Sequence, residues 1–201
     1  MILNCILQEA NISTKISSGI SNSSSFYLRN FYSNNRDASK SSKRNDFSHV
    51  ELAYEDSLAL KKASSKLNNH KYSDTKEDEN TDENTINTIK AYVDVYNNAL
   101  DSSNGSDSAT MERYAKQLKK LSSKYSDELK DIGITIGSDG KMEVNDNLIK
   151  AAGNEKIKMV FGKDVGYTKS IRSITSRMNT AAYNELYSSV TGNGSKINIS
   201  L

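Results

Sequence analysis

Residues 86–100 read INTIKAYVDVYNNAL and decide the fold class of this chain. Apolar side chains recur along them at alternating intervals of three and four residues, which predicts an amphipathic helix over about 84–102. Such spacing is typical both of a bundle core and of a coiled-coil seam that needs a partner. We expect an association stripe that contacts a partner or a second copy of the chain, formed by Ile86, Ile89, Val93, Tyr96 and Leu100.

The same alternation continues after Asn104-Gly105, a pair that breaks the first helix. It predicts a second helix over about 108–130, antiparallel to the first because the connection is short. The apolar positions of this second helix are Met111, Tyr114, Leu118, Leu121, Tyr125 and Leu129.

A helix start precedes both, at residues 47–52, which read FSHVEL. Ser48 is placed to cap the amide of Glu51, and Glu51 is placed to reach back to Ser48, while Phe47 can pack on Leu52. The apolar positions that follow predict a helix over about 48–67.

Between residues 132 and 144 the apolar period changes from helical to alternating. Ile134 and Ile136 lead into a turn that ends at Asp139-Gly140, and Met142 opens a second run. Two short β-prone runs around a Gly/Asp turn predict a small hairpin at about 132–144. Further helices are predicted at about 145–152, 155–161 and 166–188.

Composition separates a part of the chain that can form a core from two ends that have too few apolar residues to do so. Hydrophobic residues make up 35% of the 201 residues, below the roughly 45–50% of an ordinary globular domain. We expect residues 1–46 to be a mostly disordered Ser/Asn-rich arm, with its Phe/Tyr pairs at 26–27 and 31–32 as an alternative docking element. Residues 191–201 are expected to be a flexible tail. The predicted class is therefore mainly α: coiled-coil-like helices in a bundle over 47–190, with one small β-hairpin.

The net charge of the chain does not indicate a class of partner. The 27 Lys and Arg residues nearly cancel the 25 Asp and Glu residues, and the formal net charge is +2. No apolar run approaches the roughly 20 residues that span a bilayer. We therefore expect protein partners, and neither nucleic acid nor a membrane.

Residues for catalysis or metal binding are scarce. Cys5 is the only cysteine, and the histidines are His49 and His70, which excludes a disulfide within the chain and a zinc site of the His/Cys kind. Neither histidine is near a nucleophile motif, and no phosphate-binding glycine loop is present. We expect no cofactor, no metal and no enzymatic activity.

One segment resembles a calcium loop in part. Asp78, Asn80 and Asp82 alternate as the first ligands of such a loop do, but Glu83 occupies the place of the required glycine. The favoured interpretation is a solvated acidic loop that starts the helix after it.

Two motifs carry a resemblance to a known family. Residues 89–100, IKAYVDVYNNAL, resemble the "FV-x-x-YN-x-L" helix of the flagellar hook-associated protein 2 family, which forms the filament cap. Residues 129–148 resemble its "L-x-x-IGI…DG-x-L-x-(I/V)-D-x-x-K-L" segment, and the likeness covers about 84–187. Besides residues of the stripe, the matching positions are Tyr92, Asn97, Ile132, Gly133, Ile134, Asp139, Gly140 and Leu148.

The resemblance implies a non-enzymatic structural protein of the flagellum, outside the cytoplasm and secreted by the flagellar export route. Its partners would be flagellar axial subunits or copies of itself, and the matching positions would shape the fold. The family's proteins are longer, with outer domains and a long C-terminal helix, so we do not expect a self-sufficient cap. The alternative is a cytoplasmic adaptor or chaperone-like regulator that uses the same helical module.

Overall fold

The structure, a computed structural model, describes residues 44, 47–72, 80–163 and 165–192. The predicted arm over 1–46 lies almost wholly outside them, as do residues 193–201 of the predicted tail. The chain divides into two compact units, Ser48–Asn184 and a second formed by Met1–Phe47 with Glu185–Leu201. In the second unit the amide of Phe47 donates to the carbonyl of Arg44 over 3.3 Å.

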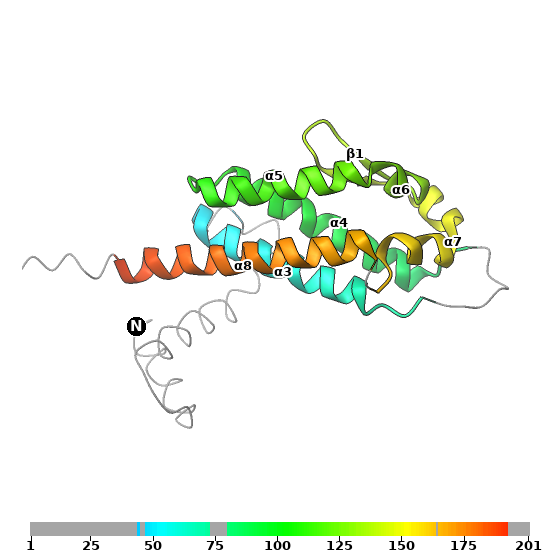
Figure 1. Ribbon diagram of the computed structural model, residues 1–201, viewed down its shortest axis with the longest axis horizontal. Coiled ribbons are helices and arrows are strands. Elements are labelled where there is room, and N and C mark those ends of the chain that lie inside the picture. Colours follow the sequence, from blue (N-terminus) through cyan, green and yellow to red (C-terminus); the bar gives the residue numbers. More distant parts are fainter. Residues whose placement is uncertain (1–43, 45–46, 73–79, 164, 193–201) are drawn as a thin grey trace, which may run out of the picture. The chain divides into compact units, whose positions relative to one another are not determined.

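Helices dominate the described residues, and the predicted mainly α class is confirmed (Figure 1). The elements, in chain order, are α3 (His49–Asn68), α4 (Glu83–Asn104), α5 (Ala109–Lys124), α6 (Ser126–Asp131), β1 (Ile134–Ile136), β2 (Met142–Val144), α7 (Asp146–Phe161) and α8 (Gly166–Gly192). The strands form one antiparallel pair in which Ile134 faces Val144 and Ile136 faces Met142.

Local sequence signals start the helices. The Ser48 hydroxyl accepts from the Glu51 amide over 3.4 Å, and the Glu51 carboxylate accepts from the Ser48 amide over 2.8 Å. This capping box satisfies two amides at the helix N-terminus that have no partner within the helix. Asp82, from the calcium-like segment, is the N-cap of α4, with its Oδ1 accepting from the Thr85 amide over 2.9 Å.

Three predicted boundaries differ from the structure. The helix predicted over 108–130 is interrupted at Tyr125, which has φ −108° and ψ 22° and separates α5 from α6. The Tyr125 ring meets the Tyr167 ring edge-on, with 5.4 Å between the ring centroids. Helical periodicity does not predict this tertiary contact. The helices predicted at 145–152 and 155–161 join directly at Gly153, whose φ of 78° marks the kink. The last helix continues through Thr191 to Gly192, into the predicted tail.

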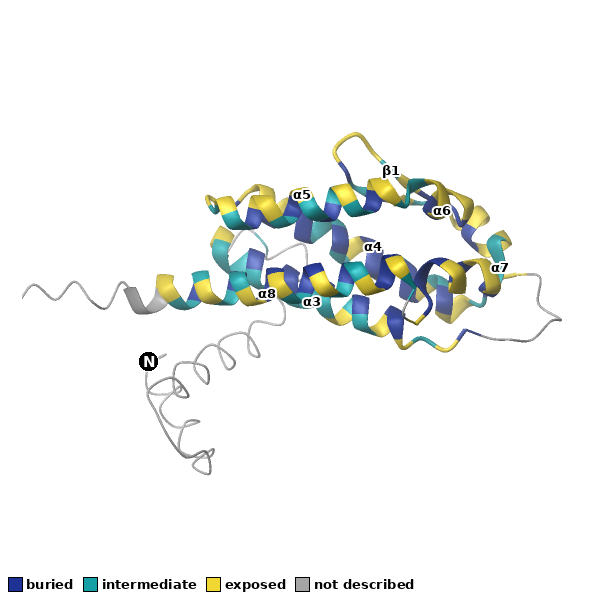
Figure 2. Cartoon of the chain, viewed as in Figure 1, coloured by how far each residue is buried: buried dark blue, intermediate teal, exposed yellow. Residues whose placement is uncertain are grey.

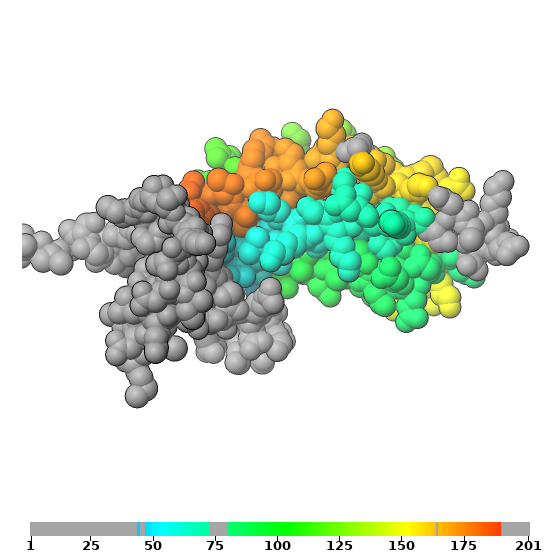
Figure 3. All heavy atoms as spheres, turned by 90° about the horizontal axis from the view of Figure 1, so that it is seen from below, coloured from blue at the N-terminus to red at the C-terminus, as the bar shows by residue number. Residues whose placement is uncertain are grey.

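Helix α4 lies at the centre of the Ser48–Asn184 unit, where it packs against α3, α5, α7 and strand β2. Helix α8 contacts α3 as well: the Asn179 side chain of α8 donates to the Ser57 hydroxyl of α3 over 3.1 Å. Figure 3 shows the surface of α3 between those of α8 and α4. The helix faces that meet are buried and the outer faces are exposed (Figure 2).

The proposed association stripe lies inside this packing. Ile89 and Tyr96 are 0% exposed, Val93 is 4% exposed, and Leu100 is buried with them, while Ile86 is half-buried against the same core. This corrects the expectation of a partner surface, because the helices of the same chain already cover the row. Apolar residues at intervals of three and four show that one face of a helix is apolar. They do not show whether helices of the same chain or of a partner pack against that face.

Glu55 on α3 is an unusual acid in this unit. Its Oε1 is buried with no hydrogen-bond partner among the described residues, and burial raises its pKa from 4.5 to about 7, with Lys62 opposing the shift and Asp56 adding to it.

A pH-dependent change in stability follows from that carboxyl. The pKa of Glu55 is higher in the folded chain than in the unfolded chain, so the protonated carboxyl stabilises the fold. This stabilisation is fully present below pH 4.5 and is lost as the pH rises through about 7. Glu55→Gln is expected to raise the free energy of unfolding above pH 7 by about 1 kcal/mol, a value reduced for solvent screening, and to change it little in acid. Urea denaturation at several pH values measures this difference, and an equal effect at every pH would contradict it.

Candidate functional site

Helix α4 holds the hairpin through a pair of hydrogen bonds. The Asn97 Nδ2 donates to the Met142 carbonyl over 2.9 Å, and the Asn97 Oδ1 accepts from the Met142 amide over 2.9 Å. The Tyr96 hydroxyl donates to the Gly140 carbonyl over 3.4 Å. An exposed ion pair of 2.8 Å between Lys141 and Asp101 lies beside them. We call Tyr96, Asn97, Gly140 and Met142 the α4–hairpin joint.

Two glycines of the predicted motif shape the hairpin. Gly133 has φ 85° and Gly140 has φ 84°, the left-handed region in which side chains with a Cβ are strained. The Gly133 carbonyl accepts from the Asn145 amide over 2.8 Å, which connects the start of β1 to the cap of α7. The Asp139 carboxylate accepts from the Lys141 amide over 3.0 Å and closes the turn.

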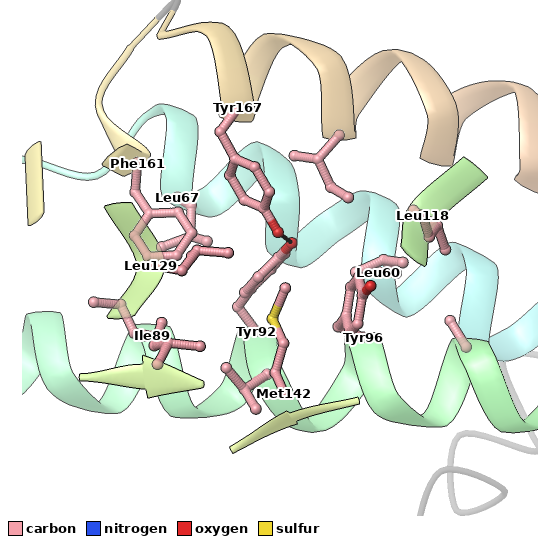
Figure 4. Close-up of a cluster of buried hydrophobic side chains, with 14 of the residues drawn as sticks. Leu60, Leu67, Ile89, Tyr92, Tyr96, Leu118, Leu129, Met142, Phe161 and Tyr167 are labelled. Carbon is pink, nitrogen blue, oxygen red and sulfur yellow. Dashed lines mark hydrogen bonds between the residues drawn. The ribbon is translucent and has the colours of Figure 1, made fainter. Parts of the chain in front are cut away.

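Tyrosine hydroxyls meet in the core beneath the joint (Figure 4). Tyr92 and Tyr167 share a hydrogen bond of 2.7 Å, and the Ser122 hydroxyl is 3.5 Å from that of Tyr167. The Phe161 ring meets both tyrosine rings edge-on at 5.6 Å. Burial raises the pKa of Tyr167 to about 12 and also raises the pKa of Tyr92 well above its usual value. The hydroxyls therefore stay protonated near neutral pH and serve to hydrogen-bond one another within the packed core.

His70, Thr85 and Asp82 form a chain of hydrogen bonds that looks like a catalytic relay. The His70 Nε2 is 2.7 Å from the Thr85 hydroxyl, which donates to Asp82 Oδ2 over 2.6 Å. Because the hydroxyl proton faces Asp82, Nε2 must be the donor to Thr85 and is no base for it. Thr85 is also fully buried, out of reach of a substrate.

The electrostatics of this group fit a helix cap. Burial lowers the pKa of His70, against the attraction of Asp82. For Asp82, burial alone would raise the pKa, but the hydrogen bonds from Thr85 and Asn154 outweigh it and hold the pKa below its usual value. A stable anion at this position also favours the start of α4 through the helix dipole.

The joint makes a direct prediction for Asn97. In Asn97→Ala the amide and carbonyl of Met142 lose their partners, which is expected to lower the free energy of unfolding by about 2 kcal/mol and to speed hydrogen exchange at the Met142 amide. The neighbouring Asn98→Ala is the matched control, expected within about 0.5 kcal/mol of the parent. Equal effects of the two substitutions would show that the side-chain bonds do not hold the hairpin.

The remaining motif positions divide between the core and the surface. Ile132 and Ile134 are buried, Asp139 is exposed in the turn, and Leu148 is 53% exposed on α7. Met159 of the same helix is 63% exposed. The tyrosines Tyr114 and Tyr125 are half-buried at the edge of the core, as expected for packing residues.

The surface carries a feature that sequence reasoning missed. A groove of about 740 Å³ lies between α5 and α8, with Leu121 and Ile174 among its lining residues. Its charged lining side chains are all cationic: Lys120, Lys124, Lys169 and Arg177. A signal was present, because residues 166–184 contain no Asp or Glu, but the antiparallel pairing with α5 was needed to find the groove.

Within the described ranges, no group of three His, Cys, Asp or Glu side chains is arranged to hold a metal ion. Asp78, the first residue of the calcium-like segment, lies outside those ranges. None of the helices in the part of the chain that the structure describes is both long and apolar enough to cross a bilayer.

Comparisons with protein-family models, with curated proteins and with solved structures find no match to this chain.

Proposed function

We propose that this chain is a non-enzymatic assembly protein, related to the flagellar filament cap, whose helical domain associates with protein partners. Its partners are flagellar axial subunits or further copies of the chain, outside the cytoplasm. The role is one of shape and contact: the helices and hairpin present a rigid surface, and no residue acts as a nucleophile or a metal ligand.

One observation carries the proposal: part of the "YN" helix that resembles the cap family contacts the turn and second strand of the hairpin that resembles it too. Asn97 of the "YN" helix binds the backbone of Met142, and Tyr96 binds that of Gly140 in the "DG" turn. Gly133, of the "IGI" strand, adopts the left-handed backbone that only glycine adopts without strain.

The buried tyrosine pair supports the same proposal in energetic terms. Tyr92 belongs to the "YN" helix, and its hydroxyl bonds to Tyr167 of α8, which ties the two ends of the resembling region together. A module fixed in this way keeps its outer faces in one arrangement, so docking a partner costs less ordering entropy.

Export tests the proposal and separates it from its alternative. In a flagellated host, the full-length chain is expected in the culture medium or on the cell surface, and only when the flagellar export apparatus works. A strain that lacks the export apparatus is the control for cell lysis. Retention of the chain in the cytoplasm of export-competent cells would contradict the proposal and favour a cytoplasmic adaptor.

A further inference from the structure

The groove between α5 and α8 has the form of a helix-docking site. Gln117, Lys120, Leu121 and Lys124 line one wall at intervals of three and four residues, which is one face of α5. Ser170, Ser173, Ile174 and Arg177 line the other wall from α8. From residue 117 to residue 124 the wall is about 10 Å long, room for two turns of a docked helix.

A second hollow extends the groove along the same two helices. It is lined by Tyr114 of α5 and by residues of α8 that include Thr180 and Ala181. Arg177 lines both hollows, so they adjoin each other. The two helices run antiparallel (Figure 1). Residue 114 of α5 therefore lines a hollow with residue 181 of α8, and residue 124 lines the groove with residues of 169–177.

Cations surround α8 on its other flank as well. A third hollow, between α3 and α8, is lined by Lys61, Lys169 and Arg172 together with serines. No Asp or Glu is among the residues that line the three hollows. Six cations therefore line the hollows around α8, on a surface that also holds apolar side chains.

We propose that this groove binds an acidic amphipathic helix of a partner protein. Carboxylates on that helix would pair with Lys120, Lys124, Lys169 and Arg177. Aliphatic side chains would pack on the half-buried Leu121, beside Ile174, which is 8% exposed. The inference rests on the proposed assembly function and names the chemistry of its partner.

The apolar lining excludes the most acidic part of this chain as the occupant. Residues 73–83 read SDTKEDENTDE and contain carboxylates but no apolar side chain, so they match the cations and offer nothing to pack on the apolar part of the lining. The lining also disfavours single-stranded nucleic acid, which stacks on aromatic rings, because no aromatic residue lines the groove and Tyr114 alone lines the hollow that extends it.

Three synthetic peptides test the proposal with the purified full-length chain. The first is a helical peptide of about 18 residues with Glu on one face and Leu at intervals of three and four. The second has Gln in place of Glu, and the third has Ser in place of Leu. We expect each replacement to weaken binding by about tenfold or more in fluorescence anisotropy, and salt to weaken binding of the first peptide more than that of the Gln peptide.

Charge reversal assigns the binding to the groove. The variant Lys120→Glu with Lys124→Glu is expected to lose affinity for the acidic peptide by about tenfold or more and to prefer a version with Lys in place of Glu. Reversing two exposed lysines elsewhere, Lys130 on α6 and Lys156 on α7, is the control and should change affinity by about twofold at most. Circular dichroism of both variants shows that they stay folded.

Three outcomes would overturn the proposal. These are equal effects of the two charge-reversed variants, equal binding of the peptides with and without Leu, and tighter binding of oligothymidine or phosphatidylserine vesicles through the same lysines. None of them depends on export, so a failure here would leave the assembly role standing. Failure of export would in turn leave the peptide result unchanged.

Discussion

Val93→Asp is expected to unfold the Ser48–Asn184 unit rather than to release a partner from it. Val93 is 4% exposed in the core row of α4, among helices of its own chain. A carboxylate there loses its hydration without gaining a partner, at a cost of about 4 kcal/mol or more, a large fraction of the roughly 5–15 kcal/mol that stabilises a domain. Urea denaturation followed by far-UV circular dichroism measures the loss.

Ala91→Asp is the matched control, because it adds the same charge to the exposed face of the same helix. We expect it to change the free energy of unfolding by about 1 kcal/mol at most. A Val93→Asp protein as stable as the control, but altered in its oligomeric state, would mean that the row is an association seam after all.

Gly133→Ala is the second large effect that we expect. A Cβ at this position would lie 2.7 Å from the backbone nitrogen of Ile149 and 2.7 Å from the Leu148 Cβ, and the φ of 85° would strain any L residue. Backbone strain and the clash together should cost about 3 kcal/mol and loosen the connection between β1 and α7. Thermal or urea denaturation measures this cost.

Gly105→Ala controls for the loss of backbone freedom alone. Gly105 has φ −83° at the end of α4, and a Cβ there meets only the Asp101 carbonyl, at 3.3 Å. The substitution should leave stability within about 1 kcal/mol of the parent. If both alanine variants were equally stable, the left-handed backbone at Gly133 would not be required by the fold.

Local signals predicted much of this architecture because their causes are local. The Ser48 and Glu51 capping box and the Gly-rich turn before Met142 act over a few residues, and the structure contains both a box and a hairpin there. The break at Tyr125 was not predictable in this way, since it accompanies a ring contact with Tyr167, far away in the sequence.

The candidate surfaces were harder to predict than the helices. The row at Ile89, Val93 and Tyr96 has the spacing of a seam, but burial by α3, α5 and α7 depends on tertiary packing that spacing does not encode. The groove needed the same information, because Lys120 and Lys169 become neighbours only when α5 and α8 lie side by side. What periodicity does specify is which face of each helix is apolar, and that part agrees with the buried faces.

The most direct test of the assembly role is the association of the chain with flagella. Flagella sheared from a host that expresses the tagged full-length chain are purified and treated with a cross-linker, and the products are identified by mass spectrometry. We expect the chain to purify with the flagella and to cross-link to axial subunits or to further copies of itself. Its absence from flagella of a host that makes the chain and retains it in the cytoplasm would contradict the assembly role.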